Sequence, residues 1–148
     1  MTGRSGRRLG TFARAARIAA VYGAAVLLKR VVPISALARW YWSAPRPTSR
    51  HELQRREAVL VRLQRLRGLE SDDCLEAALV RYRELAKAGR SPRLVLGLAR
   101  PEGRVAGHAW VEVDGRPYAE RPEAAGSYAI VAAFGERGLP VAIESEGR

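Results

Sequence analysis

Apolar positions recur with two different periods along the chain, and the period changes near residue 90. Before that point they recur every three or four residues, which predicts helices over residues 11–32, 34–42 and 49–67, the last capped by Thr48 or Ser49. Pro33 and the SAPRPTS stretch at 43–49 separate these helices, because proline cannot continue one. We expect the basic, glycine-rich residues 1–10 to be a disordered lead-in.

The second half begins with one more amphipathic helix, over residues 74–88, which Gly89 can end. Short runs of β-forming residues then predict strands at 93–99, 108–113, 116–120 and 128–134, with a weaker one at 141–143. Helices followed by a helix on a small antiparallel sheet make an α+β fold. We divide the chain into a basic tail and helices (residues 1–48) and a core (residues 49–148), which together form one compact domain.

The net charge of +11 lies entirely in the N-terminal half. Residues 1–67 hold 15 basic and two acidic side chains, whereas the rest of the chain holds 11 basic and 13 acidic ones. An acidic partner, a membrane surface or RNA could use this charge, and a solvated helical face explains it equally well. Almost all basic residues are arginine, which is typical of a GC-rich genome, so we expect no nucleic-acid partner.

The segment Ile18–Leu28 is apolar and lies between Arg17 and Lys29. It is shorter than the roughly 20 residues that a membrane-spanning helix needs. It can be a core helix, an interfacial helix on a membrane surface, or the apolar region of a signal peptide, although no small-x-small cleavage site follows it. We favour the core helix. A single cysteine excludes an intramolecular disulfide and fits the reducing cytoplasm, with membrane association through this helix as an alternative.

Cys74 is the only thiol and stands at the start of a predicted helix, directly after Asp72 and Asp73. The positive end of a helix dipole lowers the pKa of a cysteine, which favours a nucleophilic role. The two aspartates act in the opposite direction, so the thiolate needs a partner such as a histidine. Asp73 and Glu76 also have the spacing of a capping box. The alternative is a small buried apolar residue, a common environment for free cysteine.

His108 begins an alternating strand whose other face carries Ala109, Val111 and Val113. A three-residue turn at 113–115, with Gly115 left-handed, would set the register of the following strand. This register pairs Glu112 with Arg116, Trp110 with Tyr118 and His108 with Glu120. A two-residue turn at 114–115 would send Glu120 to the opposite face. We prefer the first register because all three pairs are favourable, and Glu120 then completes a Cys–His–acid triad. Otherwise Glu112 is the next candidate.

The stretch from Cys74 to Glu120, with its HAWVEVDG segment, resembles the transglutaminase-like core, a circularly rearranged relative of papain. It resembles more closely the leader peptidase of lasso-peptide biosynthesis, the stand-alone peptidase half of the B protein. This resemblance implies a cysteine peptidase in which Cys74 is the nucleophile, His108 the base and Glu120 the orienting acid. The acid of the family is usually aspartate, so Glu120 is a departure.

The resemblance also implies a place in the maturation of a ribosomally made peptide. The expected partners are a precursor peptide, a small leader-recognition protein that presents it, and an ATP-dependent lasso cyclase. Bacterial leader peptides are often acidic, so we expect the basic N-terminal half to dock the leader-bound partner. We expect no metal and no other cofactor in this chain. Two alternatives remain: a transglutaminase-like acyl transferase that uses the same thioester, and a non-enzymatic basic adaptor that binds membranes or RNA.

Overall fold

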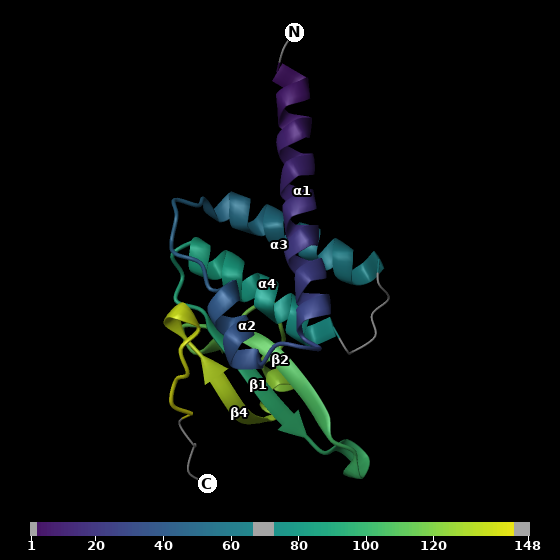
Figure 1. The fold of residues 1–148 in the computed structure, drawn as a ribbon, viewed down its shortest axis with the longest axis vertical. Coiled ribbons are helices and arrows are strands. Elements are labelled where there is room, and N and C mark those ends of the chain that lie inside the picture. The colour runs from purple at the N-terminus through teal and green to yellow at the C-terminus, as the bar shows by residue number, and fades with distance from the viewer. Residues whose placement is uncertain (1–2, 67–72, 144–148) are drawn as a thin grey trace.

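The fold is the predicted α+β arrangement, in which helices precede a small antiparallel sheet (Figure 1). The computed structural model describes residues 3–66 and 73–143. The main helices are α1 (Gly3–Leu28), α2 (Ile34–Tyr41), α3 (Arg50–Leu66) and α4 (Cys74–Lys87). The strands are β1 (Arg93–Ala99), β2 (Ala106–Val113), β3 (Arg116–Pro117) and β4 (Ala129–Phe134). Among the described residues there are also three short helical turns: η2 (Pro101–Gly103), α5 (Pro122–Gly126) and η3 (Glu136–Gly138).

The four strands lie in the order β3-β2-β1-β4, and all neighbours are antiparallel. Helix α4 covers one face of the sheet, where Ala109 and Val111 join the main core. Trp110 is also buried, but in a separate cluster with Val95, Ala125 and Ala133. Both faces of β2 are therefore covered, and its position is fixed from two sides.

Helix α4 is the centre of the main core. Its residues Ala78, Leu79, Tyr82 and Leu85 are almost completely buried, because α1, α2 and the sheet surround them. Burial of a large apolar side chain contributes about 1.5–3 kcal/mol, so these positions hold α4 firmly in place. The helix that begins with Cys74 is thus the most constrained helix of the fold.

Helix α1 begins at Gly3, so the prediction of a disordered lead-in over residues 1–10 was wrong for the described part of that segment. Once the later turns are packed, each further residue adds one hydrogen bond without a new nucleation cost. Ile18, Tyr22 and Ala25 are buried, so one face of this part of α1 packs against the core. The purple N-terminal half stands beyond the rest of the molecule (Figure 1).

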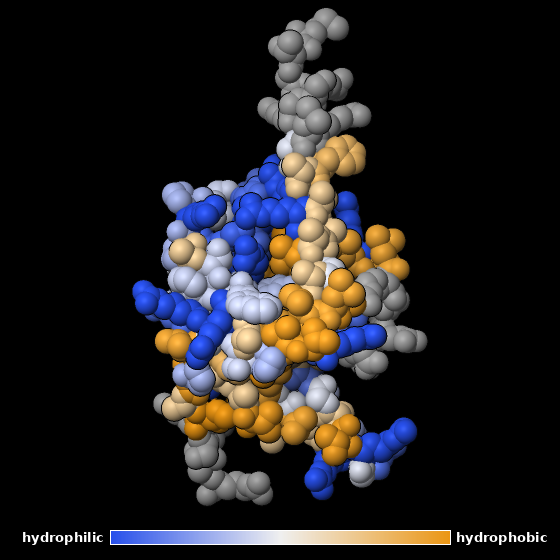
Figure 2. Space-filling view, viewed as in Figure 1, coloured by the Kyte–Doolittle hydropathy of each residue, from blue (hydrophilic) through white to orange (hydrophobic). Residues whose placement is uncertain are grey.

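One window of α1, Gly10–Leu28, is long and apolar enough to cross a membrane, and 17% of it is buried. The window exceeds Ile18–Leu28 because Phe12 and several alanines extend the apolar run toward the N-terminus. Leu27, Val31 and Trp40 are exposed near the end of α1 and on α2, and Figure 2 shows apolar side chains gathered in this region. Leu27, Val31 and Trp40 therefore give the basic N-terminal half an exposed apolar surface.

Several predicted boundaries are confirmed. Strand β1 has the predicted limits, and Ser49 caps α3 by accepting a hydrogen bond from the backbone N–H of Glu52 at 3.1 Å. Gly89 follows α4 with φ +72°. Two predictions were wrong. Strand β3 ends at Pro117 instead of Glu120. Residues 141–143 form no strand, although the backbone N–H of Val141 donates a hydrogen bond to the carbonyl oxygen of Ala133 in β4.

Candidate active site

Cys74 is the first residue of α4 and is partly buried. Burial raises the pKa of its thiol above the ordinary value, although the backbone N–H groups of Ala109 and Leu75 act in the opposite direction. The charge of Glu76 raises this pKa further. The expectation that the helix N-terminus lowers the pKa is therefore wrong in its net direction, because desolvation outweighs the helix end. A neutral thiol needs a base when it attacks.

The predicted capping box at the start of α4 is absent. Asp73 is the N-cap residue but its side chain makes no capping hydrogen bond, and it accepts one from the Tyr22 hydroxyl at 3.0 Å instead. Glu76 is completely buried and its carboxylate lies 2.7 Å from Nζ of Lys29. Tyr22 lies on α1 and Lys29 directly follows it. The start of α4 is therefore held by contacts with this N-terminal segment, and not by a capping box within α4.

His108 lies on β2 and its ring contacts two aromatic side chains. The ring centroid lies 5.7 Å from that of Trp110, in a stacked arrangement, and 5.0 Å from that of Tyr128. Gly97 pairs with His108 across the sheet, and a Cβ atom there would lie 2.6 Å from Cβ of Tyr128 and 2.9 Å from the Trp110 ring. The absence of a side chain at Gly97 thus makes room for the aromatic support of His108.

The hairpin after β2 differs from our prediction. Val113 pairs with Arg116 and Glu112 with Pro117, so the turn has two residues, Asp114 and Gly115, both with positive φ. This is the two-residue turn that the sequence analysis set aside, and the proposed three-pair register is wrong. A two-residue Asp-Gly turn with both residues in the left-handed conformation matches the twist of the flanking strands, which explains why it forms in place of the three-residue turn.

Glu120 nevertheless reaches His108, with Oε1 2.5 Å from Nε2. The chain can do this because β3 has already ended and Ala119 adopts a left-handed conformation with φ +58°. That residue breaks the alternation of the strand, so Glu120 does not go to the face that the two-residue turn alone would dictate. Glu112, the alternative acid, instead accepts a hydrogen bond from the Trp110 indole at 3.0 Å.

Cys74, His108 and Glu120 line one cleft of about 270 Å³. The sequence predicted these three residues but missed other polar side chains of the cleft, chiefly Gln64 and Arg81. Gln64 comes from the charged helix α3, and the helical period of that segment gave no sign that Gln64 faces this cleft. The remaining lining residues are Ala77, Ala109, Trp110, Val111, Tyr118 and Ala119.

The donor set of this cleft suits covalent chemistry at sulfur. In the described residues no group of three or more His, Cys, Asp or Glu side chains is placed to hold a metal ion. The cleft combines a thiol at a helix N-terminus, an imidazole and a carboxylate bonded to that imidazole. Such a set can form a thioester with an acyl group, in which the imidazole accepts the thiol proton.

Comparison with known families agrees with this chemistry. The family model for the transglutaminase-like superfamily matches residues 18–133. The chain belongs to this superfamily. The match includes all three candidate residues and most of the N-terminal helices, and it fits both cysteine peptidases and acyl transferases of the transglutaminase-like type. No curated protein and no solved structure matches the chain significantly.

Proposed function

We propose that this transglutaminase-like protein is a cysteine peptidase that removes the leader from a lasso-peptide precursor. The observation that carries the proposal is the common cleft of Cys74, His108 and Glu120, in which the carboxylate contacts the imidazole. The fold and the family match support thioester chemistry, and the resemblance of the HAWVEVDG segment supports the leader as the substrate.

In the proposed reaction the sulfur of Cys74 attacks the carbonyl carbon of the scissile peptide bond. His108 accepts the thiol proton and then gives it to the departing amine, while Glu120 orients the ring and stabilises its charged form. The product is a thioester between Cys74 and the leader. Water, activated by the neutral His108, attacks this thioester and releases the free carboxylate of the leader.

The first test incubates the precursor peptide with the protein and its leader-recognition partner, followed by mass spectrometry. Cys74→Ala should abolish cleavage while circular dichroism and partner binding remain unchanged. His108→Ala should lose nearly all cleavage, whereas His51→Ala is the matched control, because His51 is exposed on α3. Cleavage by Cys74→Ala at the wild-type rate would contradict the peptidase proposal.

The same experiment separates hydrolysis from acyl transfer. With water as the acceptor, the leader is released as a free acid. With an added primary amine, a transferase would release the leader as an amide, whose mass differs. We expect the free acid even at high amine concentration, and a dominant amide product would favour the transferase alternative.

The proposal also assigns a docking role to the N-terminal half. This half holds the excess of positive charge, and its surface also exposes Leu27, Val31 and Trp40. We propose that the leader-recognition protein, with an acidic leader bound, docks there. Charge-driven docking should weaken steeply between low and moderate salt. Affinity that does not change over this range would favour an apolar contact on α1 and α2 instead.

A further inference from the structure

A further pocket lies between three helices, away from the cleft that holds Cys74. Its volume is about 240 Å³, and residues of α1, α3 and α4 line it. Cys74 begins α4 and Lys87 ends it, so about 20 Å of helix separate the thiol from this pocket. The lining residues are Gly10, Ala13, Arg14, Arg17, Ile18, Glu52, Arg56, Glu84 and Lys87.

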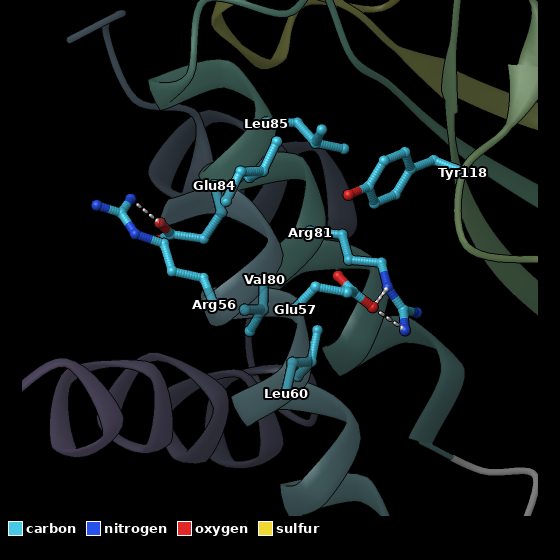
Figure 3. A pocket seen from close by; sticks show the side chains of 9 residues that line it. Arg56, Glu57, Leu60, Val80, Arg81, Glu84, Leu85 and Tyr118 are labelled. Carbon is cyan, nitrogen blue, oxygen red and sulfur yellow. Dashed lines mark hydrogen bonds and ion pairs between the residues drawn. The ribbon is translucent and has the colours of Figure 1, made fainter. Parts of the chain in front are cut away.

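Both carboxylates of this pocket already accept hydrogen bonds from arginines. Oε1 of Glu52 accepts one from Nε of Arg14 at 2.6 Å and one from Nε of Arg56 at 3.1 Å. Oε2 of Glu84 accepts one from Nη1 of Arg56, and Figure 3 shows this pair between α3 and α4. The lining residues include four basic and two acidic side chains, which leaves a net charge of +2 in the pocket.

Lys87 is a buried cation whose donors are unused. Its side chain is 5% exposed, yet among the described residues its ammonium group makes no hydrogen bond. Oε1 of its ion-pair partner Glu84 lies 3.6 Å from Nζ, beyond hydrogen-bond distance. Burial lowers the pKa of Lys87, the charge of Glu84 does not offset this effect, and nearby arginines lower the pKa further. A buried ammonium group needs an acceptor, and the pocket that it lines is where one can bind.

The arginines of the pocket also keep donors for a ligand. In hydrogen bonds to described residues, Arg14 uses only Nε, and Arg56 uses only Nε and Nη1. Arg17 is exposed and forms no ion pair with a described residue. An anion in the pocket can therefore accept hydrogen bonds from α1, α3 and α4 at once. A phosphoryl group has several acceptor oxygens for such converging donors, and its two negative charges match the net charge of the pocket.

We infer that this pocket binds a phosphoryl dianion, either inorganic phosphate or a small phosphate monoester, between Lys87 and the arginines of α1 and α3. No covalent bond forms or breaks on binding. The site is independent of the proposed peptidase function, because it lies at the opposite end of α4 from Cys74. The bound anion joins α1 to α3 and α4, so it stabilises the folded chain by mass action.

Isothermal titration calorimetry of the full chain with inorganic phosphate, at constant ionic strength, tests this site. Lys87→Met should weaken phosphate binding about 10- to 100-fold, because it removes a buried charged donor. Arg17→Met should weaken it about 2- to 5-fold, because Arg17 is exposed to solvent. Arg39→Met is the matched control with the same loss of charge: Arg39 is exposed on α2 and does not line the pocket, so this variant should bind as wild type.

Urea denaturation gives a second measurement. Phosphate should raise the urea midpoint of wild type, Arg39→Met and Cys74→Ala by the same amount, and that of Lys87→Met by less. Exclusion of phosphate from the protein surface stabilises every variant alike, so the difference between variants reports the pocket. Each variant is compared with itself in chloride, which removes any difference in basal stability.

A wild-type chain that gives no saturable binding of phosphate would overturn the inference. Equal affinity of wild type, Lys87→Met and Arg17→Met would also overturn it, because phosphate would then bind elsewhere on the basic surface. If Lys87→Met does not fold, the comparison of Arg17→Met with Arg39→Met decides, and equal affinity of these two overturns the site.

Two further ligands test the chemical class. Acetate carries one negative charge and should bind more weakly than phosphate at the same ionic strength, whereas equal affinity for acetate would overturn the assignment to a dianion. Glycerol 3-phosphate separates the two sources of the phosphoryl group. Displacement of phosphate by this ester supports a monoester ligand, and binding of inorganic phosphate without such displacement supports the free ion.

Discussion

Oε1 of Glu120 lies 2.5 Å from Nε2 of His108, and this contact defines which ring nitrogen of the neutral imidazole carries the proton. A carboxylate accepts the proton of Nε2–H, so the neutral ring carries its lone pair on Nδ1. The stacked ring of Trp110 and the tilted ring of Tyr128 limit how far His108 can rotate away from this arrangement. The orientation of the His108 ring therefore depends on one hydrogen bond and two aromatic contacts.

Replacement of Glu120 tests its orienting role. Glu120→Ala should slow precursor cleavage by about 10- to 10⁴-fold, because the tautomer is no longer fixed while the nucleophile and the base remain. Glu120→Asp should retain much more activity, since a shorter carboxylate can still reach the ring directly or through water. Glu112→Ala is the control, because Glu112 contacts Trp110 and not His108. A Glu120→Ala enzyme as fast as wild type would contradict the role of Glu120.

The pH dependence of thiol alkylation tests whether Cys74 is a neutral thiol at rest. Burial raises its pKa above the ordinary value of about 8.5, so the thiolate fraction at pH 7 is small. The rate with iodoacetamide should rise continuously from pH 6 to beyond about pH 9, without a plateau at acidic pH. A plateau between about pH 5 and 7 would instead show a preformed pair of thiolate and imidazolium, and His108→Ala would then remove it.

Gly97→Ala tests the support under His108. The added methyl group would lie 2.6 Å from Cβ of Tyr128, so the strand or the aromatic rings must move. Overpacking of this kind costs about 1–3 kcal/mol in the free energy of unfolding. We expect a lower denaturant midpoint together with a lower kcat for cleavage. Gly107→Ala on the neighbouring strand β2 is the control, because its nearest contact, a Leu98 methyl group, is 3.8 Å away. Equal stability of both variants would contradict the packing argument.

The sequence predicted the elements of this site better than their connections. Strand β1 and the start of α4 follow from periodicity and from residue types that have a strong local preference. The contact of His108 with Glu120 was predicted from a register that the structure does not have, so it is present for a different reason. The register of the hairpin did not follow, because the left-handed conformation of Ala119 is imposed by the surrounding fold and has no local signal. Gln64 was missed for a similar reason: the crossing of α3 over α4 decides which face of α3 meets the cleft.

The hydroxyl of Tyr82 connects α4 to the C-terminal segment, and its removal tests how much this connection contributes to stability. It donates to the carbonyl of Gly135 and accepts from the N–H of Gly138 at 3.0 Å, in a fully buried position. Tyr82→Phe leaves both groups without this partner, which should reduce the free energy of unfolding by about 1–3 kcal/mol. The lower end is expected, because the N–H of Gly138 also bonds to the carbonyl of Gly135 at 3.2 Å. Chemical denaturation measures the difference.

Tyr118→Phe is the matched control for this variant. Tyr118 is also partly buried, but among the described residues its hydroxyl makes no hydrogen bond. We therefore expect little change in its denaturant midpoint. If Tyr82→Phe and Tyr118→Phe had the same stability as wild type, the anchoring role of the Tyr82 hydroxyl would be wrong.

Tyr41 and Tyr82 together predict how stability changes at alkaline pH. Burial raises the pKa of each phenol to about 12, whereas a phenol in the unfolded chain titrates near pH 10. Between these values the unfolded state has lost protons that the folded state still binds, so the free energy of unfolding falls as pH rises from about 10 to 12. Below pH 10 both phenols are neutral in both states, and their contribution does not vary. Denaturant midpoints should fall more steeply above about pH 10, with a slope on the order of 1 kcal/mol per pH unit for each of these two tyrosines, in addition to the decrease that the raised pKa of Cys74 causes from a lower pH. Tyr41→Phe should reduce this slope by on the order of 1 kcal/mol per pH unit, because one of the titrating groups is removed. An unchanged slope in that variant would mean that Tyr41 is accessible to hydroxide in the folded protein.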